Sequence, residues 1–301
     1  MRGFEDVIKL AEKRGPKIIS VACCHDKEVL LAVEMARKAN IAKAILVGDI
    51  EKTKEIAKEL NLDLANYETV DIKDLTEASR KAVELVSSGK ADILMKGLVD
   101  TSIVLKAALD KEIGLRTDSV LSHVAVFKVD GYDRLFFLTD AAMNIAPDLK
   151  TKAKLIENAL VVTKALDIEK PNVGIICAKE KPYDKMPATL DAVELVKMNE
   201  NGTIKDCVIG GPFALDNAVS EIAAKHKGVT YPGAGNVDIL LVPAIEAGNM
   251  LYKSLVFFAK ADNAGIIVGA KAPIVLTSRA DSEETKLNSI ALGVLMASKN
   301  K

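Results

Sequence analysis

Short apolar runs alternate with longer amphipathic segments along most of the chain. The first runs predict buried strands at 17–22, 44–47, 67–70 and 92–95. The segments before and between them have helical spacing, which predicts helices at 4–14, 27–39, 52–60 and 76–87. Strands that alternate with helices of this length are typical of βαβ units. The first part of the chain is therefore expected to form an α/β domain with a parallel sheet.

The pattern changes near the middle of the chain. The apolar runs 122–127 and 135–139 flank Asp130-Gly131, a pair that favours a hairpin turn, so these strands are expected to be antiparallel. After a break at 140–147, helices are expected at 152–166, 188–198, 215–225 and 250–258, with strands at 173–178, 206–209, 237–243, 265–268 and 273–277. We predict two α/β domains, one from residues 1–145 and 274–301 and one from residues 146–273.

The last predicted strand leads through the polar turn 278–282 into an amphipathic helix. The apolar stripe of this helix consists of Leu287, Ile290, Ala291, Val294 and Leu295. The first N–H groups of a helix have no partner within it, and the helix dipole favours an anion there.

Three side chains near this turn suit an anion. Arg279 can hold two phosphate oxygens with its planar fork, Ser278 adds a hydroxyl, and Lys286 adds charge one turn later. A purely structural interpretation also fits, because Ser278 with Asp281, or Asp281 with Glu284, could be capping pairs. These residues alone leave both interpretations open.

A second strand–turn–helix unit, at 92–109, repeats this arrangement. Lys106 falls about one turn into its helix and could face an anion at the carboxyl edge of the sheet, or could simply face solvent. His123 is expected to be a packed residue and not a catalytic base, because no neighbouring Ser and Asp suggest a triad.

Composition narrows the possible functions. The chain has 301 residues, 49% of them apolar and 28% charged, and a net charge of −1, which favours a globular protein over a nucleic-acid or membrane-surface binder. No apolar run reaches the length of a membrane span, and the first 15 residues do not resemble a signal peptide. Four cysteines without zinc spacing and three histidines make a metal site unexpected and suggest a reducing cytoplasm. No P-loop occurs, and Gly233-Ala-Gly235 precedes a strand where a dinucleotide-binding motif would follow one.

Seven segments in order resemble the phosphate acetyl/butyryl transferase family over nearly the whole chain. They are ILVGD (45–49), KAVELVSSGKADILMKGLVDT (81–101), GLRTDSVLSHVAVF (114–127), MPATLDA (186–192), GPFALD (211–216), AGNMLYKSL (247–255) and PIVLTSRADSEETKLNSIAL (273–292). The resemblance implies exchange of a short acyl group, butyryl in the first instance, between CoA and phosphate, with no metal or redox cofactor. It also implies a fold similar to isocitrate and isopropylmalate dehydrogenases, with two α/β domains flanking a cleft, and a homodimer or larger homo-oligomer.

The resemblance also assigns roles to residues. Ser278 would hydrogen-bond the developing oxyanion or phosphate, and Arg279 would bind phosphate. Lys106 would also serve phosphate, although the family carries Arg there and a lysine loses bidentate binding. We also expect four further residues to bind phosphate or CoA: Arg116, Asn249, Lys253 and Lys286.

The resemblance does not choose between two candidates for the general base. The acetyl branch places an Asp seven residues after the Ser, where this chain has Thr285. Asp281 and Glu284 are the acids nearby, and the choice between them stays open. No cysteine matches a nucleophile of the family, so direct transfer in a ternary complex is expected.

Alternatives remain within and outside this family. An acetyl or branched short-chain substrate is possible because one or two methylenes are worth only about 1–3 kcal/mol in an apolar pocket. A metal- and NAD-dependent dehydrogenase of similar fold would need a carboxylate cluster that the sequence does not suggest. A third alternative is a binding protein that kept the fold without the reaction.

Overall fold

The computed structural model describes residues 1–278 and 281–299, and the chain divides into two compact units. Gly3–Leu121 and the segment from Asn263 onward form the first unit, and Ser122–Asp262 form the second. The boundaries differ from the expected residues 145 and 273. The two strands of the predicted hairpin pair with each other inside the second unit, and the strand that begins at Asp262 pairs inside the first.

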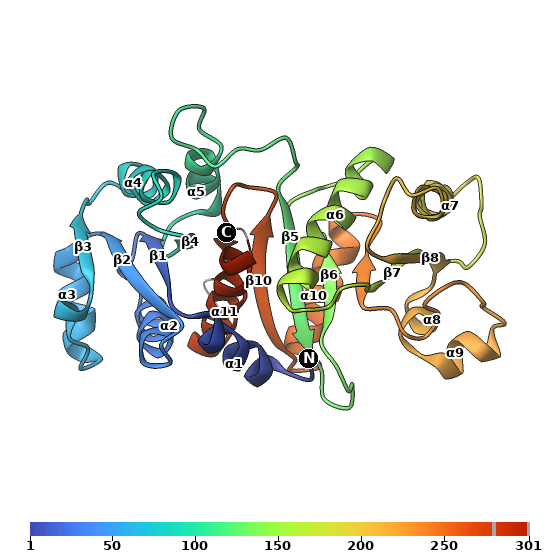
Figure 1. Ribbon diagram of the computed structural model, residues 1–301, viewed down its shortest axis with the longest axis horizontal. Helices are drawn as coiled ribbons and strands as arrows, with labels where there is room; N and C mark the ends of the chain where they lie inside the picture. Colours follow the sequence, from blue (N-terminus) through green and yellow to red (C-terminus); the bar gives the residue numbers. More distant parts are fainter. Residues whose placement is uncertain (279–280, 300–301) are drawn as a thin grey trace. The chain divides into compact units, whose positions relative to one another are not determined.

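The first unit contains a mainly parallel sheet in the order β3-β2-β1-β4-β11-β10. Its strands are β1 (Lys17–Ala22), β2 (Ala42–Gly48), β3 (Glu68–Asp71), β4 (Ile93–Lys96), β10 (Asp262–Val268) and β11 (Ile274–Val275). Its helices are α1 (Phe4–Arg14), α2 (Lys27–Lys38), α3 (Ile50–Glu59), the 3-10 turn η1 (Leu64–Asn66), α4 (Leu75–Ser87), α5 (Thr101–Ala108) and α11 (Glu283–Lys299). Only β10 runs antiparallel to its neighbour among these described pairs. Figure 1 shows α4 and α5 on one side of the strands and α1 and α2 on the other.

The C-terminal helix α11 is buried on all sides and is not amphipathic as expected. Its buried residues run without interruption from Lys286 to Ala297. The reason is its position, since it packs against α1, α2 and β11 at once. The apolar stripe identified in the sequence is therefore only part of the buried surface, and Leu292, outside that stripe, is only 1% exposed.

The second unit contains strands in the order β5-β6-β9-β7-β8. The strands are β5 (Ser122–Lys128), β6 (Phe136–Thr139), β7 (Asn172–Ile176), β8 (Val208–Phe213) and β9 (Ile239–Leu241). The helices are α6 (Leu149–Ala165), α7 (Pro187–Glu200), α8 (Leu215–Val219), α9 (Glu221–His226) and α10 (Ile245–Phe257). The predicted antiparallel pair is confirmed, with Ala125 opposite Leu138, and the other described pairs are parallel.

The helix predicted at 215–225 is in fact two helices. Ser220 has an extended backbone and its Oγ accepts a hydrogen bond of 3.3 Å from the N–H of Ala223, so it caps α9. A serine hydroxyl competes with the helix backbone in this way, which ends α8 at Val219. The described residues include no helix that is long and apolar enough to cross a membrane.

Candidate functional site

Three parallel strands of the first unit bring polar residues to one edge of their sheet. Strand β4 lies between β1 and β11, with Val21 and Val275 both paired to Met95. The residues that follow these strands therefore meet at the carboxyl edge, where open α/β sheets bind ligands. Ser278 follows β11 at this edge, and Lys96 ends β4.

The turns after β1 and β4 lie in direct backbone contact. The N–H of Gly97 donates to the carbonyl of Ala22, and the N–H of Leu98 donates to the carbonyl of Cys23, both at 2.8 Å. A Cβ on Gly97 would lie 2.3 Å from the Cys23 carbonyl oxygen, so only glycine fits here. This contact fixes the position of Lys96, the residue just before Gly97.

Lys96 is a buried cation that the sequence analysis did not select. Lys96 is only 5% exposed, and its Nζ donates to the carbonyls of Gly97 and Val99 at 3.3 Å each. The signal in the sequence is a lysine that directly ends an apolar strand, beside a glycine. Its placement at the carboxyl edge makes it a further candidate for holding an anion.

The turn at Ser278 is organised by Asp281 and Lys286. The N–H of Ser278 donates to Asp281 Oδ2 at 2.7 Å, and the N–H of Asp281 donates to the carbonyl of Ser278 at 3.2 Å. Lys286 is only 3% exposed, and its Nζ donates to the carbonyls of Ser278 and Asp281. Ser278 itself is exposed, so the turn is supported from inside while its serine faces outward. Arg279 lies outside the described residues.

The helix that follows starts with a cap different from the two pairs considered in the sequence. Ser282 Oγ accepts a hydrogen bond of 3.3 Å from the N–H of Thr285. Asp281 contacts Ser278, as one capping hypothesis expected, but it shapes the turn before the helix. Glu284 is exposed in the first turn of α11. The two acids thus occupy different environments.

Lys106 and Arg116 are both exposed in the first unit. Because α5 has only eight residues, Lys106 lies in its last turn and gains nothing from the positive N-terminal end of the helix. Arg116 belongs to a segment held at Leu115, whose carbonyl accepts from the N–H of Lys271 at 2.8 Å. Their roles in substrate binding remain predictions.

Asn249 and Lys253 lie on α10 in the second unit. Asn249 Nδ2 donates to the carbonyl of Ala141 at 3.2 Å, whereas Lys253 is exposed one turn later. A Cβ on Gly248 would lie 2.4 Å from the carbonyl oxygen of Asp140, so α10 packs closely on this segment. Asn249 is therefore held in place, and Lys253 is the exposed one of the two predicted residues.

His123 and Asp140 form a buried polar group beneath α10. Asp140 accepts hydrogen bonds from the backbone of His123 at 3.2 Å and of Ala142 at 2.8 Å. The His123 ring meets the ring of Tyr252 edge to face at 6.0 Å, and burial lowers its pKa. His123 is packed, as expected.

All four cysteines are buried and unpaired. Burial raises the pKa of Cys24, Cys177 and Cys207 to about 11 and also raises the pKa of Cys23. The reactive form of a cysteine is the thiolate, so these thiols are poor nucleophiles near neutral pH. Within the described residues, no group of three or more His, Cys, Asp and Glu side chains could hold a metal ion.

Comparison with known proteins identifies the group to which the chain belongs. The model of the phosphate acetyl/butaryl transferase family matches residues 4–80 and 73–294. The chain belongs to this family. It is 54% identical over 300 residues to a phosphate butyryltransferase of Clostridium beijerinckii, covering 100% of this chain and 99% of that protein. It is 44% identical to a phosphate acetyltransferase of Thermotoga maritima, covering 98% and 99%.

Solved structures confirm the α/β fold of this family member. A branched-chain phosphotransacylase from Enterococcus faecalis V583 matches with a TM-score of 0.82 and 37% identity, covering 93% of this chain and 99% of that one. A 4-hydroxythreonine-4-phosphate dehydrogenase from Klebsiella pneumoniae matches with a TM-score of 0.54 and 11% identity, covering 93% and 99%. The second likeness concerns the fold alone and agrees with the expected similarity to dehydrogenases.

Proposed function

We propose that this protein transfers a short-chain acyl group, preferably butyryl, between CoA and inorganic phosphate. The reaction is acyl-CoA plus phosphate in exchange with acyl phosphate plus CoA. The observation that carries this proposal is the 54% identity to a phosphate butyryltransferase across essentially both full chains. The exposed Ser278 at the carboxyl edge of the sheet supports it, because ligands of open α/β sheets bind at that edge.

The proposed chemistry is a direct transfer. In the direction of acyl-CoA formation, the CoA sulfur attacks the acyl carbon of the acyl phosphate, a C–S bond forms, and the C–O bond to phosphate breaks. The thiol proton passes to Asp281 or Glu284, and phosphate leaves with the bonding electrons. The Ser278 hydroxyl hydrogen-bonds the oxygen that becomes negative, and Arg279 holds the phosphate. The high pKa values of the buried cysteines support a path without an acyl-cysteine.

An acetyl or branched short-chain substrate is the second candidate. It is supported by the phosphate acetyltransferase at 44% identity and by the branched-chain phosphotransacylase at 37%. We further propose that the reaction needs no metal or redox cofactor and that the protein works as a homodimer or larger homo-oligomer. Four unpaired thiols support a cytoplasmic location as part of this proposal.

The test is CoA release from butyryl-CoA and acetyl-CoA, followed with a thiol-reactive dye, with and without phosphate and in the presence of EDTA. Phosphate-dependent release that is faster with butyryl-CoA is expected. Faster release from acetyl-CoA would keep the reaction and replace the substrate. No phosphate-dependent release from either thioester would contradict the proposal.

A further inference from the structure

The exposed large apolar side chains in the described part of the first unit are Leu75, Leu98 and Leu109. Leu98 follows β4 at the carboxyl edge of the sheet, and Leu75 begins α4, which follows β3 at the same edge. Leu109 lies away from that edge, because it follows the last residue of α5. Single exposed leucines are common on protein surfaces. The two at the carboxyl edge differ from the third in their place, since open α/β sheets bind ligands there.

The backbone on both sides of Leu98 is held in place. Its N–H donates to the carbonyl of Cys23 at 2.8 Å. The buried Lys96 donates to the carbonyl before Leu98 and to the carbonyl after it, those of Gly97 and Val99. A side chain at Gly97 would collide with the Cys23 carbonyl oxygen, so this turn has little freedom to change. A fixed turn therefore presents the Leu98 side chain, which is 36% exposed, at the carboxyl edge.

The register of the sheet brings Leu98 to the level of Ser278. Strands β4 and β11 are parallel neighbours, with Met95 paired to Val275. Leu98 and Ser278 each lie three residues beyond this pair, so they follow neighbouring strands at the same level. Neighbouring strands are about 4.8 Å apart. Both residues are exposed and both belong to the first unit, so an apolar side chain and a hydroxyl are available to one ligand at this edge.

The acyl chain is the part of the proposed substrates that suits Leu98. A thioester carries its acyl chain on the same carbon as its carbonyl oxygen, and in the proposed function Ser278 hydrogen-bonds that oxygen. The chain therefore starts next to the group that Ser278 contacts. A butyryl chain has two methylene groups more than an acetyl chain, and each gains free energy when an apolar surface removes it from water. Phosphate, which is charged, gains nothing from a leucine.

We propose that Leu98 contacts the acyl chain of the substrate and favours butyryl over acetyl. This inference rests on the proposed function for the reaction and for the role of Ser278. It adds a residue that distinguishes substrates by chain length. The Ser278 hydroxyl and the Lys96 ammonium cannot do this, because both interact with polar groups that the two thioesters share.

The test compares kcat/KM for butyryl-CoA and acetyl-CoA in CoA release at saturating phosphate. Leu98→Ala is expected to lower the butyryl-to-acetyl ratio of kcat/KM about fourfold, which is the factor that one methylene group in apolar contact contributes. The loss falls on butyryl-CoA, because acetyl-CoA lacks the methylene groups. Leu98→Met, which keeps the apolar bulk, should retain the ratio. Leu109→Ala is the matched control, at a leucine that is 46% exposed beyond the far end of α5, and should also retain it.

The outcomes separate this inference from the proposed function. An unchanged ratio in Leu98→Ala, an equal loss for both thioesters, or the same shift in Leu109→Ala would overturn the inference, while acyl transfer by the unmodified protein keeps the proposed function. If the unmodified protein releases no CoA, titration calorimetry with the two thioesters makes the same comparison. A fourfold fall in the ratio of affinities would then contradict only the proposed function, and an unchanged ratio would contradict both.

Discussion

Two adjacent residues carry the main roles in the proposed mechanism. Ser278 contributes a hydroxyl, and Arg279 contributes a guanidinium. Replacing Ser278 with Ala should lower turnover about a hundredfold, which is the usual cost of removing one oxyanion donor. Arg279→Ala should lower it at least as much, and Arg279→Lys should restore only part, because lysine cannot bind phosphate in a bidentate manner. Steady-state kinetics at varied phosphate and butyryl-CoA measures both effects.

These two variants need a check that the turn itself survives. Ser278 holds the turn through its backbone N–H and carbonyl, which the alanine variant keeps. The thermal unfolding midpoint is therefore expected to match that of the unmodified protein. Near-normal turnover in either alanine variant would remove that residue from the proposed mechanism.

The two acids of this region can be separated by their effect on pH dependence. Asp281 accepts the N–H of Ser278, whereas Glu284 is exposed in the first helical turn. If Glu284 is the base, Glu284→Gln removes the acid limb of the pH–rate profile and leaves stability unchanged. Asp281→Asn should instead lower stability by about 1 kcal/mol, as expected for loss of a charged hydrogen-bond acceptor. A Glu284→Gln variant with an unchanged profile would exclude Glu284 as the base.

The buried cysteines provide a test of direct transfer. Cys23, Cys24, Cys177 and Cys207 can each be changed to Ala, and each variant that folds should retain phosphate-dependent CoA release. The physical reason is that burial keeps these thiols protonated near neutral pH. Loss of turnover in one folded variant would indicate a covalent intermediate. Circular dichroism distinguishes that outcome from unfolding.

At the scale of single elements, the burial of helix α11 on all sides can be tested with one substitution. Leu292 lies outside the apolar stripe seen in the sequence and yet is 1% exposed. Leu292→Ala should therefore lower the free energy of unfolding by about 2–5 kcal/mol, as for other buried leucines. Leu109→Ala, at a leucine that is 46% exposed, should change it by less than about 1 kcal/mol. Equal, small effects in urea unfolding would mean that α11 is solvated on one side.

The sequence predicts most elements because local patterns decide them. The alternation of apolar runs and amphipathic segments placed the helices and strands, and the Asp130-Gly131 turn predicted the antiparallel pair. The pattern failed where distant packing decides the outcome. The burial of α11 depends on α1 and α2, and the split at Ser220 depends on one hydroxyl that binds Ala223.

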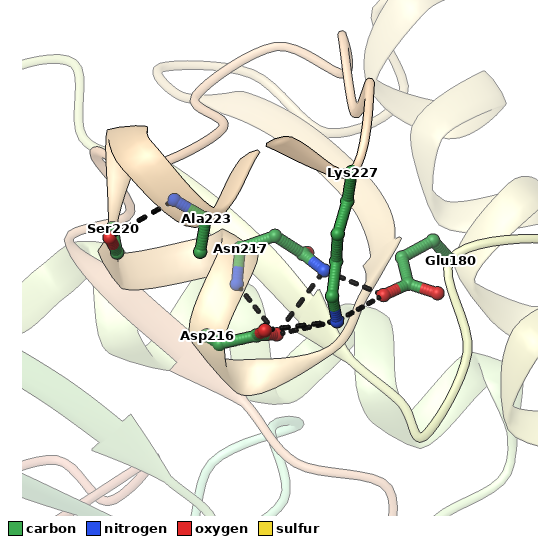
Figure 2. Close-up of polar contacts among 6 residues, drawn as sticks. All are labelled: Glu180, Asp216, Asn217, Ser220, Ala223 and Lys227. Carbon is green, nitrogen blue, oxygen red and sulfur yellow. Dashed lines mark hydrogen bonds and ion pairs between the residues drawn. The ribbon is translucent and has the colours of Figure 1, made fainter. Parts of the chain in front are cut away.

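The same limit applies to the candidate site. The strand–turn–helix pattern found the turn at Ser278 but could not show that Lys286 Nζ donates to the carbonyls of Ser278 and Asp281. The role of Lys286 toward phosphate stays a prediction. Lys96 went unselected because its signal, a lysine that ends an apolar strand beside a glycine, does not show that the side chain is buried. The salt bridge of 2.9 Å between Glu180 and Lys227 (Figure 2) joins two segments of the second unit that are far apart in the chain, so no local pattern predicts it.

The stability of the whole molecule in acid is expected to depend on a charge pair in the first unit, Arg37 with Glu34. Arg37 donates two hydrogen bonds to Glu34, at 2.8 and 3.0 Å, and the Tyr67 hydroxyl donates a third. These bonds, led by those from Arg37, lower the pKa of Glu34 from 4.5 to about 2. The bond from Tyr67 also joins α2 to the segment before β3, which is an edge strand of the sheet.

A carboxyl with a lowered pKa stabilises the folded state only while it is ionised. The full contribution, about 3 kcal/mol at most, is present above pH 4.5 and is lost as the pH falls toward 2. Glu34→Gln should therefore be less stable than the unmodified protein at pH 7, and the difference should shrink by pH 3. Urea unfolding at the two pH values measures this change. A difference of the same size at both would show that Glu34 acts through packing and not through its charge.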